Sequence, residues 1–296
     1  CYSIGKHSTV FKRGKILPDT IAHSKDWKKR AATQVTRTLL QSPLKTLRLF
    51  IYREKAQADK HVEHAAVMNN ITAKYFYHWN LEILPILRGI RKLEEKENNT
   101  TLIIPKNPPK FVKESLELLE PERTIIEQGK DQIIKIDNLL LPSYPQLTQK
   151  NLSWLRKTVL QEIDDGSENY DKLYISRQRE GKRCVENFDE IKGVLSKSGV
   201  KIVKTENYSY EEQIKLTANS ESIIGVHGAG LSHIVWSKDL NVLELTNRNI
   251  NDIFWLISKQ LKHNYYSLEG KTDNPSRDSN IFLEKEKLKK KLEELK

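Results

Sequence analysis

Residues 222–231, SIIGVHGAGL, join an apolar run to a glycine-rich turn. The run Ser222 to Val226 predicts a buried β-strand, and Leu231 to Trp236 is predicted to form a short helix. Gly228 and Gly230 therefore fall at a strand-to-helix turn, where bare backbone N–H groups and the positive helix end can receive a phosphate. The alternative is a turn needed only for packing, because the spacing matches neither the dinucleotide-binding fingerprint nor the Walker loop.

The segments around this turn alternate in the same way. Short apolar runs at 173–175, 200–203 and 242–245 predict further strands. Amphipathic segments between them begin at Asn187 and Ser209, each followed three residues later by a glutamate, a pattern typical of helix starts. Strands that alternate with helices indicate a parallel sheet, so the second half is predicted to be Rossmann-like.

The first half is less regular but also mixes strands and helices. The segment Tyr77 to Leu93 predicts a helix that Pro85 kinks or breaks. Four apolar stretches are predicted to be extended: Leu47–Tyr52, Ala65–Met68, Leu102–Ile104 and Leu139–Leu141.

The domain boundary is predicted near residue 166, in the polar stretch 164–167 that follows a proline-containing connection. The expected organisation is a domain at 1–165, a nucleotide-sugar-binding domain at 166–270 and a C-terminal segment at 271–296. That last segment is predicted to form an amphipathic helix, packed either on the body of the protein or on a partner.

Arg177 and Glu244 are expected at the carboxyl ends of strands in the same sheet, where ligands of open α/β sheets bind. Arg177 suits a diphosphate because its planar fork is permanently charged, and Glu244 could accept hydrogen bonds from ribose hydroxyls. His227 could donate to a phosphate or cap the turn. A surface arginine and a salt-bridged glutamate are the plainer alternatives.

His78 and Glu82 stand four residues apart on the predicted helix, and therefore on one face. They could supply acid–base chemistry, form a structural His–Trp cluster, or belong to a metal site that lacks its other ligands. No D-x-D pair occurs, Asp164-Asp165 is a loose substitute, and Cys1 and Cys184 lack metal-ligand spacing. We expect neither a metal nor another cofactor.

The chain carries 50 lysines and arginines against 39 acidic residues, a net charge of +11. This charge predicts phosphate-bearing substrates or peripheral contact with an anionic membrane, rather than nucleic acid, because the basic residues are spread along the whole chain. No apolar run is long enough to span a bilayer, and the start lacks a signal-peptide core. We expect a cytoplasmic protein; an anchor upstream of Cys1 and the oligomeric state are left open.

Five segments, in this order, resemble those of glycosyltransferase family 61: YFYHW at 75–79 with LEILP at 81–85, YISR at 174–177, EQ at 212–213, HGAGL at 227–231 and EL at 244–245. The family includes plant xylan-decorating transferases, animal N-acetylglucosaminyltransferases and microbial proteins of capsular polysaccharide synthesis, the type that this chain resembles. His233 stands where the family commonly has asparagine.

The resemblance implies a GT-B architecture, in which two Rossmann-like domains with parallel sheets face each other, and inverting transfer without a metal. Glu244 would point toward the ribose, and His78 and Glu82 would face the donor across the cleft, one of them as base. The donor diphosphate would be held by Arg177, His227, Gly228, Ala229, Gly230 and Leu231. The predicted function is transfer of a hexose or pentose from a nucleotide-diphosphate-sugar to a hydroxyl of a glycan or glycoconjugate. A non-catalytic module that binds a nucleotide sugar or an anionic glycan is the alternative.

Overall fold

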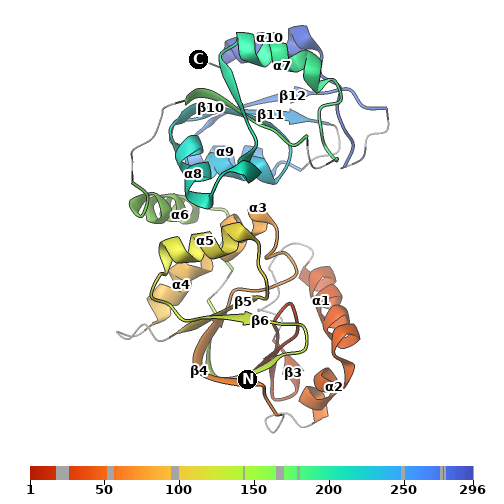
Figure 1. Cartoon of the computed structure of the whole chain (residues 1–296), viewed down its shortest axis with the longest axis vertical. Helices are drawn as coiled ribbons and strands as arrows, with labels where there is room; N and C mark the ends of the chain where they lie inside the picture. Colours follow the sequence, from red (N-terminus) through yellow and green to blue (C-terminus); the bar gives the residue numbers. More distant parts are fainter. Residues whose placement is uncertain are drawn as a thin grey trace. The chain divides into compact units, whose positions relative to one another are not determined.

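The structure is a computed structural model that describes residues 1–17, 27–51, 57–94, 100–142, 144–164, 170–178, 181–247, 251–273, 276 and 278–295. The chain divides into two compact units, Cys1–Gln146 and Leu147–Lys296. Both units, drawn in Figure 1, mix helices with parallel strands, so the predicted α/β class is confirmed.

The division lies earlier than the boundary that the sequence suggests. Residue 166 falls outside the described residues, whereas the two units meet between Gln146 and Leu147. The difference is helix α6, Gln149–Gln161, which packs against α9 and the turn η5 of the second unit. Its buried side chains Leu152, Leu155 and Val159 form the apolar face that makes this contact necessary.

The first unit is built on a seven-stranded sheet of order β3-β2-β1-β7-β4-β5-β6. The strands β7, β4, β5 and β6 run parallel, and the β1–β3 meander joins them through an antiparallel pairing of β1 with β7. Their bounds are β1 Tyr2–Ile4, β2 Thr9–Lys12, β3 Lys15–Ile16, β4 Lys60–Val67, β5 Thr101–Pro105, β6 Ile125–Gln128 and β7 Ile133–Leu140. The predicted extended segments at 65–68, 102–104 and 139–141 correspond to β4, β5 and β7.

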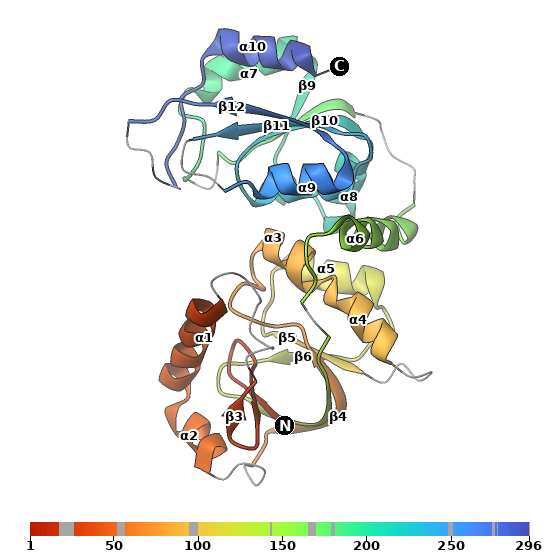
Figure 2. The ribbon, with the colours of Figure 1, turned by 180° about the vertical axis from the view of Figure 1, so that it is seen from behind.

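The prediction that Leu47–Tyr52 is extended is wrong for its described residues, because Pro43–Ile51 forms helix α2. Tyr52 lies outside the described residues. The apolar run suggests a strand, but Pro43 suits the first turn of a helix, and the buried residues Thr46 and Leu49 follow helical spacing. Helix α1, Trp27–Gln41, precedes α2, and both lie on the same side of the unit as the β1–β3 meander (Figure 2).

The predicted helix at 77–93 is interrupted where Pro85 stands. It consists of α3 Phe76–His78, a π-helical turn η3 Trp79–Ile83, and α4 Ile86–Leu93, which begins directly after the proline. Helix α5, Lys110–Leu119, completes the helices described in this unit.

The second unit is a five-stranded parallel sheet of order β12-β11-β10-β8-β9. Helices α7 and α10 cover one face, and α8 and α9 cover the other (Figures 1 and 2). The strands are β8 Tyr170–Ile175, β9 Val200–Val203, β10 Ser220–Val226, β11 Asn241–Thr246 and β12 Asn264–Glu269. The helices are α7 Phe188–Lys197, α8 Tyr210–Ala218, α9 Ile253–Leu261 and α10 Lys285–Glu294, with short 3₁₀ turns η4 Thr205–Asn207 and η5 Ala229–Val235.

Of the two predicted helix starts, Ser209 caps its helix with its side chain and Asn187 does not. Ser209 forms the expected capping box with Glu212 at the start of α8. Asn187 precedes α7 but makes no cap, because its side chain instead bonds both backbone groups of Leu283. This pairing ties the C-terminal segment to α7. The leucines Leu288 and Leu292 of α10, and Leu295 directly after it, are buried in the core of the same unit.

Candidate functional site

The second sheet has a topological switch point between β8 and β10. From β8 the chain crosses to β9 on one side, whereas β10 leads to β11 on the other. Ile175, the last residue of β8, pairs with Gly225 near the end of β10, so the loops beginning at Ser176 and His227 are neighbours. Crevices at such switch points are the usual ligand sites of doubly wound sheets.

Arg177 lies against Gly228 at this point. A Cβ atom at residue 228 would stand 2.1 Å from Nη1 and 2.7 Å from Cζ of Arg177. The backbone of Gly228 is extended, with φ of 164°, so glycine is needed here for the guanidinium and not for its conformational freedom. Nε of Arg177 is buried and has no hydrogen-bond partner among the residues that the structure describes. The arginine therefore keeps donor capacity beside an open backbone turn.

The rest of the glycine-rich turn is packed against the sheet. A Cβ atom at Gly230 would lie 2.9 Å from Cγ2 of Ile175, and Leu231 is buried over Gly225. Ala229 begins η5, a short 3₁₀ helix that reaches Val235 and overlaps the short helix predicted at Leu231–Trp236. Gly230 and Leu231 thus contact the sheet, in agreement with the packing alternative for the motif, whereas Gly228 adjoins the arginine.

His227 and Glu244 form a buried pair. Nδ1 of His227 lies 2.5 Å from Oε1 of Glu244, and the hydroxyl of Tyr265 donates to Oε2 of the same carboxylate. Glu244 is fully buried, with each oxygen engaged by a side chain of its own unit. From the sequence we expect Glu244 to accept hydrogen bonds from a ribose. In the structure its carboxylate instead accepts hydrogen bonds from His227 and Tyr265.

Tyr265 is a site residue that the sequence reasoning missed. It lies on β12, which runs parallel to β11, two residues before the partner of Glu244. Burial raises the pKa of Tyr265, and its hydrogen bond to the Glu244 carboxylate raises it further, so the phenol stays protonated as a donor. The imidazole of His227 also packs edge-on against Phe254, with ring centroids 5.3 Å apart. The carboxylate and Phe254 fix the ring orientation.

The loop at 181–185 contacts the backbone of both Arg177 and His227. Nη1 of Arg183 donates to the carbonyl of His227 at 3.4 Å, and its Nε lies 3.7 Å from Asp278. The thiol of Cys184 donates to the carbonyl of Arg177 at 3.2 Å. In the sequence, Arg183 belongs to a basic run that is typical of a solvent-exposed surface. Its hydrogen bond to the carbonyl of His227 is what identifies it as part of the site.

In the first unit, His78 and Glu82 form the pair that their spacing predicts. Nδ1 of His78 lies 2.7 Å from Oε2 of Glu82, and both side chains are about one quarter exposed, at 24% and 22%. The rings of Tyr75 and Tyr77 flank the imidazole edge-on. The π-helical turn begins at the next residue, a feature often found at functional sites.

The aromatic neighbour Trp79 is structural. Its indole is buried, and Nε1 donates to Oγ of Ser115 at 2.8 Å. Trp79 therefore has the structural packing role that is one alternative for this motif. His78 is partly exposed and is hydrogen-bonded to the carboxylate of Glu82. Across the described residues, no group of three or more His, Cys, Asp or Glu side chains is arranged to hold a metal ion.

These features define an α/β protein whose second unit is doubly wound, with an arginine and a buried His–Glu–Tyr group at its switch point. The model of the family described as glycosyltransferase 61 matches residues 76–242, more than half of the chain. The chain belongs to glycosyltransferase family 61, and this membership implies glycosyltransferase activity.

The matched range contains His78, Glu82, Arg177 and the turn at 227–231, and it ends just before Glu244. A search of curated proteins finds no match to the chain. Within the described ranges, no helix is both long and apolar enough to cross a membrane.

Proposed function

We propose that the chain transfers a hexose or pentose from a nucleotide-diphosphate-sugar to a hydroxyl of a glycan or glycoconjugate. The proposed reaction is inverting and independent of metal, in a chain of GT-B type. It requires a site that binds the donor diphosphate and stabilises the charge that grows on it as the sugar leaves. It also requires a base for the acceptor hydroxyl.

The observation that carries the proposal is the contact between Arg177 and Gly228. A permanent cation with an unused buried Nε adjoins a side-chain-free backbone turn at the sheet's switch point. A diphosphate can approach this backbone closely and receive bidentate hydrogen bonds from the guanidinium. Arg177 would supply in this way the electrostatic stabilisation of the departing nucleotide diphosphate.

His227 is proposed as a second group at the diphosphate, and Glu244 as the residue that positions it. Because Nδ1 donates to the carboxylate, Nε2 is the nitrogen that the ring can offer to a ligand. Tyr265 holds the other carboxylate oxygen, so the ring has one preferred orientation.

His78 is proposed as the base toward the acceptor, oriented by Glu82. The carboxylate at 2.7 Å from Nδ1 fixes the tautomer in which Nε2 can accept a proton, and it stabilises the imidazolium that results. The exposed ring of Tyr75 beside it offers an apolar surface of the kind against which a sugar can stack.

A thermal-shift screen of nucleoside diphosphates and nucleotide sugars, with and without EDTA, tests the donor site. A ligand at 100 times its dissociation constant stabilises the folded state by about 2.7 kcal/mol. We expect a shift from one nucleotide that resists EDTA and is lost in Arg177→Ala. The exposed Arg48→Ala variant is the matched control and should keep the shift. Absence of a shift from every nucleotide would contradict the proposed donor site.

Transfer is then measured with the nucleotide sugar that binds, over a panel of glycan acceptors. Formation of a glycoside with release of nucleoside diphosphate supports the transferase. Tight binding with neither transfer nor donor hydrolysis would instead favour a non-catalytic nucleotide-sugar-binding module.

A further inference from the structure

The helices α1 and α2 turn a polar face toward their own domain. The amide of Gln34 donates to the carbonyl of His7, and the hydroxyl of Thr38 bonds that of Thr9. The hydroxyl of Ser42 bonds the carboxylate of Asp131. These polar side chains, with Thr46 and the buried Leu49, occupy the inner side of the helix pair, which is mainly apolar in an ordinary amphipathic surface helix.

The outward face is apolar instead. Leu40, Leu44, Leu47 and Ile51 are 78%, 75%, 52% and 61% exposed, and their spacing places them along one stripe. Leu39 and Phe50 are also exposed. Of the eleven large apolar side chains that are exposed in the described residues, these six fall within two consecutive helices, and the other five are scattered. Such a concentration marks an interaction surface.

The charge of the helix pair identifies the partner. Residues 27–51 contain six lysines and arginines and no aspartate or glutamate. Arg37 and Arg48 are exposed, whereas Lys45 is paired with Asp59 at 3.3 Å. A second copy docked on this face would bring like charges together. An anionic lipid surface accommodates both the leucine stripe and the arginines.

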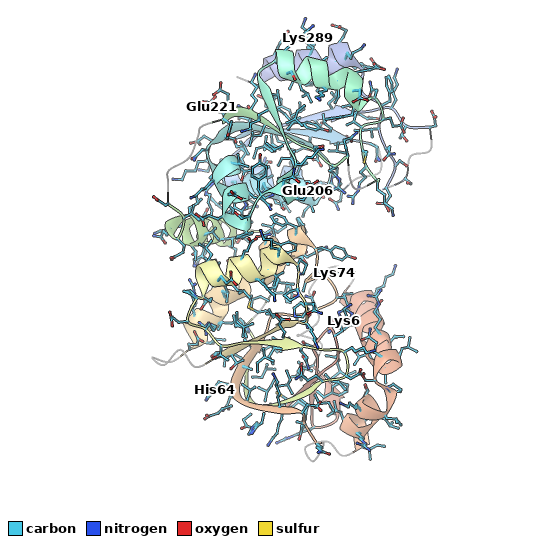
Figure 3. The ribbon with its side chains drawn as sticks, in the orientation of Figure 1. Lys6, His64, Lys74, Glu206, Glu221 and Lys289 are labelled. Carbon is cyan, nitrogen blue, oxygen red and sulfur yellow. The ribbon has the colours of Figure 1, made fainter. Side chains whose placement is uncertain are left out.

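The surroundings of the helix pair are positive as well. Burial, together with the nearby charges of Arg37, Lys6 and Lys74, lowers the pKa of His7 to about 4. Lys6 and Lys74 are labelled in Figure 3. Arg37 thus lies in a region of positive potential that extends beyond the helix itself.

We propose that α1 and α2 bind the surface of an anionic bilayer. The stripe of Leu40, Leu44, Leu47 and Ile51 enters the interface, and Arg37 and Arg48 contact lipid phosphates. This surface shares no residue with the proposed transferase site, and its test does not use catalysis.

The test is sedimentation of the full chain with vesicles of phosphatidylcholine alone or with about one third phosphatidylglycerol. We expect binding to the anionic vesicles that weakens with salt, and loss of that binding in the variant L40Q/L44Q/L47Q/I51Q. Leu93→Gln is the matched control, because it changes an exposed leucine outside the stripe and should leave vesicle binding unchanged. Equal binding by the fourfold variant and the wild type would overturn the proposal.

The variant R37Q/R48Q keeps the leucine stripe and serves if the fourfold variant fails to fold. Each charge near an anionic surface contributes about fivefold, so two removals should weaken vesicle partition about 25-fold. Unchanged partition in this variant would overturn the lipid assignment. Sedimentation velocity tests the alternative occupant, a second copy of the chain. If the wild type is a dimer that does not bind vesicles, and the fourfold variant is a monomer, the face is a self-association surface and the lipid proposal is wrong.

Discussion

The guanidinium of Arg177 occupies the space that a side chain at Gly228 would need, so the two residues form one structural unit although fifty positions separate them. The arginine follows the end of β8, and the glycine follows the end of β10. Their contact exists because these strands are neighbours on either side of the switch point.

Gly228→Ala should displace Arg177 and abolish most nucleotide binding. The new Cβ would stand 2.1 Å from Nη1, a separation that no relaxed structure permits, and the guanidinium must move. We expect at least a tenfold rise in the dissociation constant by calorimetry, about the value of one charged hydrogen bond.

The double variant tests the mechanism of this effect. In an Arg177→Ala background the clash is gone, so adding Gly228→Ala should cost little more, a non-additive result. Gly193→Ala is the control, because a Cβ at that position meets nothing within 4 Å. Full additivity would contradict the coupling of Arg177 to Gly228.

Tyr265→Phe should destabilise the second unit and weaken nucleotide binding. It leaves Oε2 of the buried Glu244 carboxylate without its donor, which costs about 1–3 kcal/mol. Chemical denaturation measures the free energy of unfolding. The neighbouring Tyr266→Phe is the control and should change the free energy of unfolding far less. An equal effect of both variants would contradict a stabilising role for the hydrogen bond from Tyr265 to Glu244.

His78→Ala and Glu82→Gln should each lower the turnover number, by about 10²–10⁴ if the pair provides the base. Nucleotide affinity should be unchanged in both, because the pair is proposed to act on the acceptor. His61 and Asp137 form another His–carboxylate pair in the same unit, at 2.6 Å, so His61→Ala is a matched control that should keep turnover. Retention of most turnover in the His78 and Glu82 variants would show the base assignment to be wrong.

Acid should destabilise the protein through its buried histidines. Burial lowers the pKa of His233 to about 3 and, as the main cause, that of His263 to about 4, from an ordinary value of 6.5. Between these folded-state pKa values and 6.5, the unfolded chain binds more protons than the folded chain. The stability contributed by the neutral histidines is therefore complete above pH 6.5 and falls as the pH drops toward 4. Each group contributes about 1.4 kcal/mol per pH unit in that window.

His233→Asn removes one of these titrating groups. Unfolding free energies measured from pH 7 to 4 should therefore change less steeply in this variant than in the wild type. His64→Asn alters a partly exposed histidine (Figure 3) and is the control for the substitution itself. An unaltered slope in His233→Asn would contradict a neutral, buried His233.

Local chemistry made much of this protein predictable from sequence. The strands β8 to β11, the capping box at Ser209 and the break at Pro85 depend on apolar runs, side chains that cap a helix, and a missing N–H, all of which act within a few residues. The i, i+4 spacing likewise sufficed to pair His78 with Glu82. The segments quoted from residues 75 to 231 were enough to indicate the family that the comparison establishes.

Tertiary structure decided what depends on partners distant in the sequence. Helix α2 contains the apolar run at 47–51, and it buries Leu49 but exposes Leu47 and Ile51. The buried polar residues beside Leu49 find partners outside the run, because the hydroxyl of Thr46 donates to the carbonyl of Ser42 and that of Ser42 donates to Asp131. Glu244 faces His227 and Tyr265 because β11 lies between β10 and β12, an order that no local pattern encodes. Sequence alone determined which residues could carry chemistry, and the packing of the sheet decided which of them meet, since hydrogen bonds and close contacts act only over the few ångströms that folding sets.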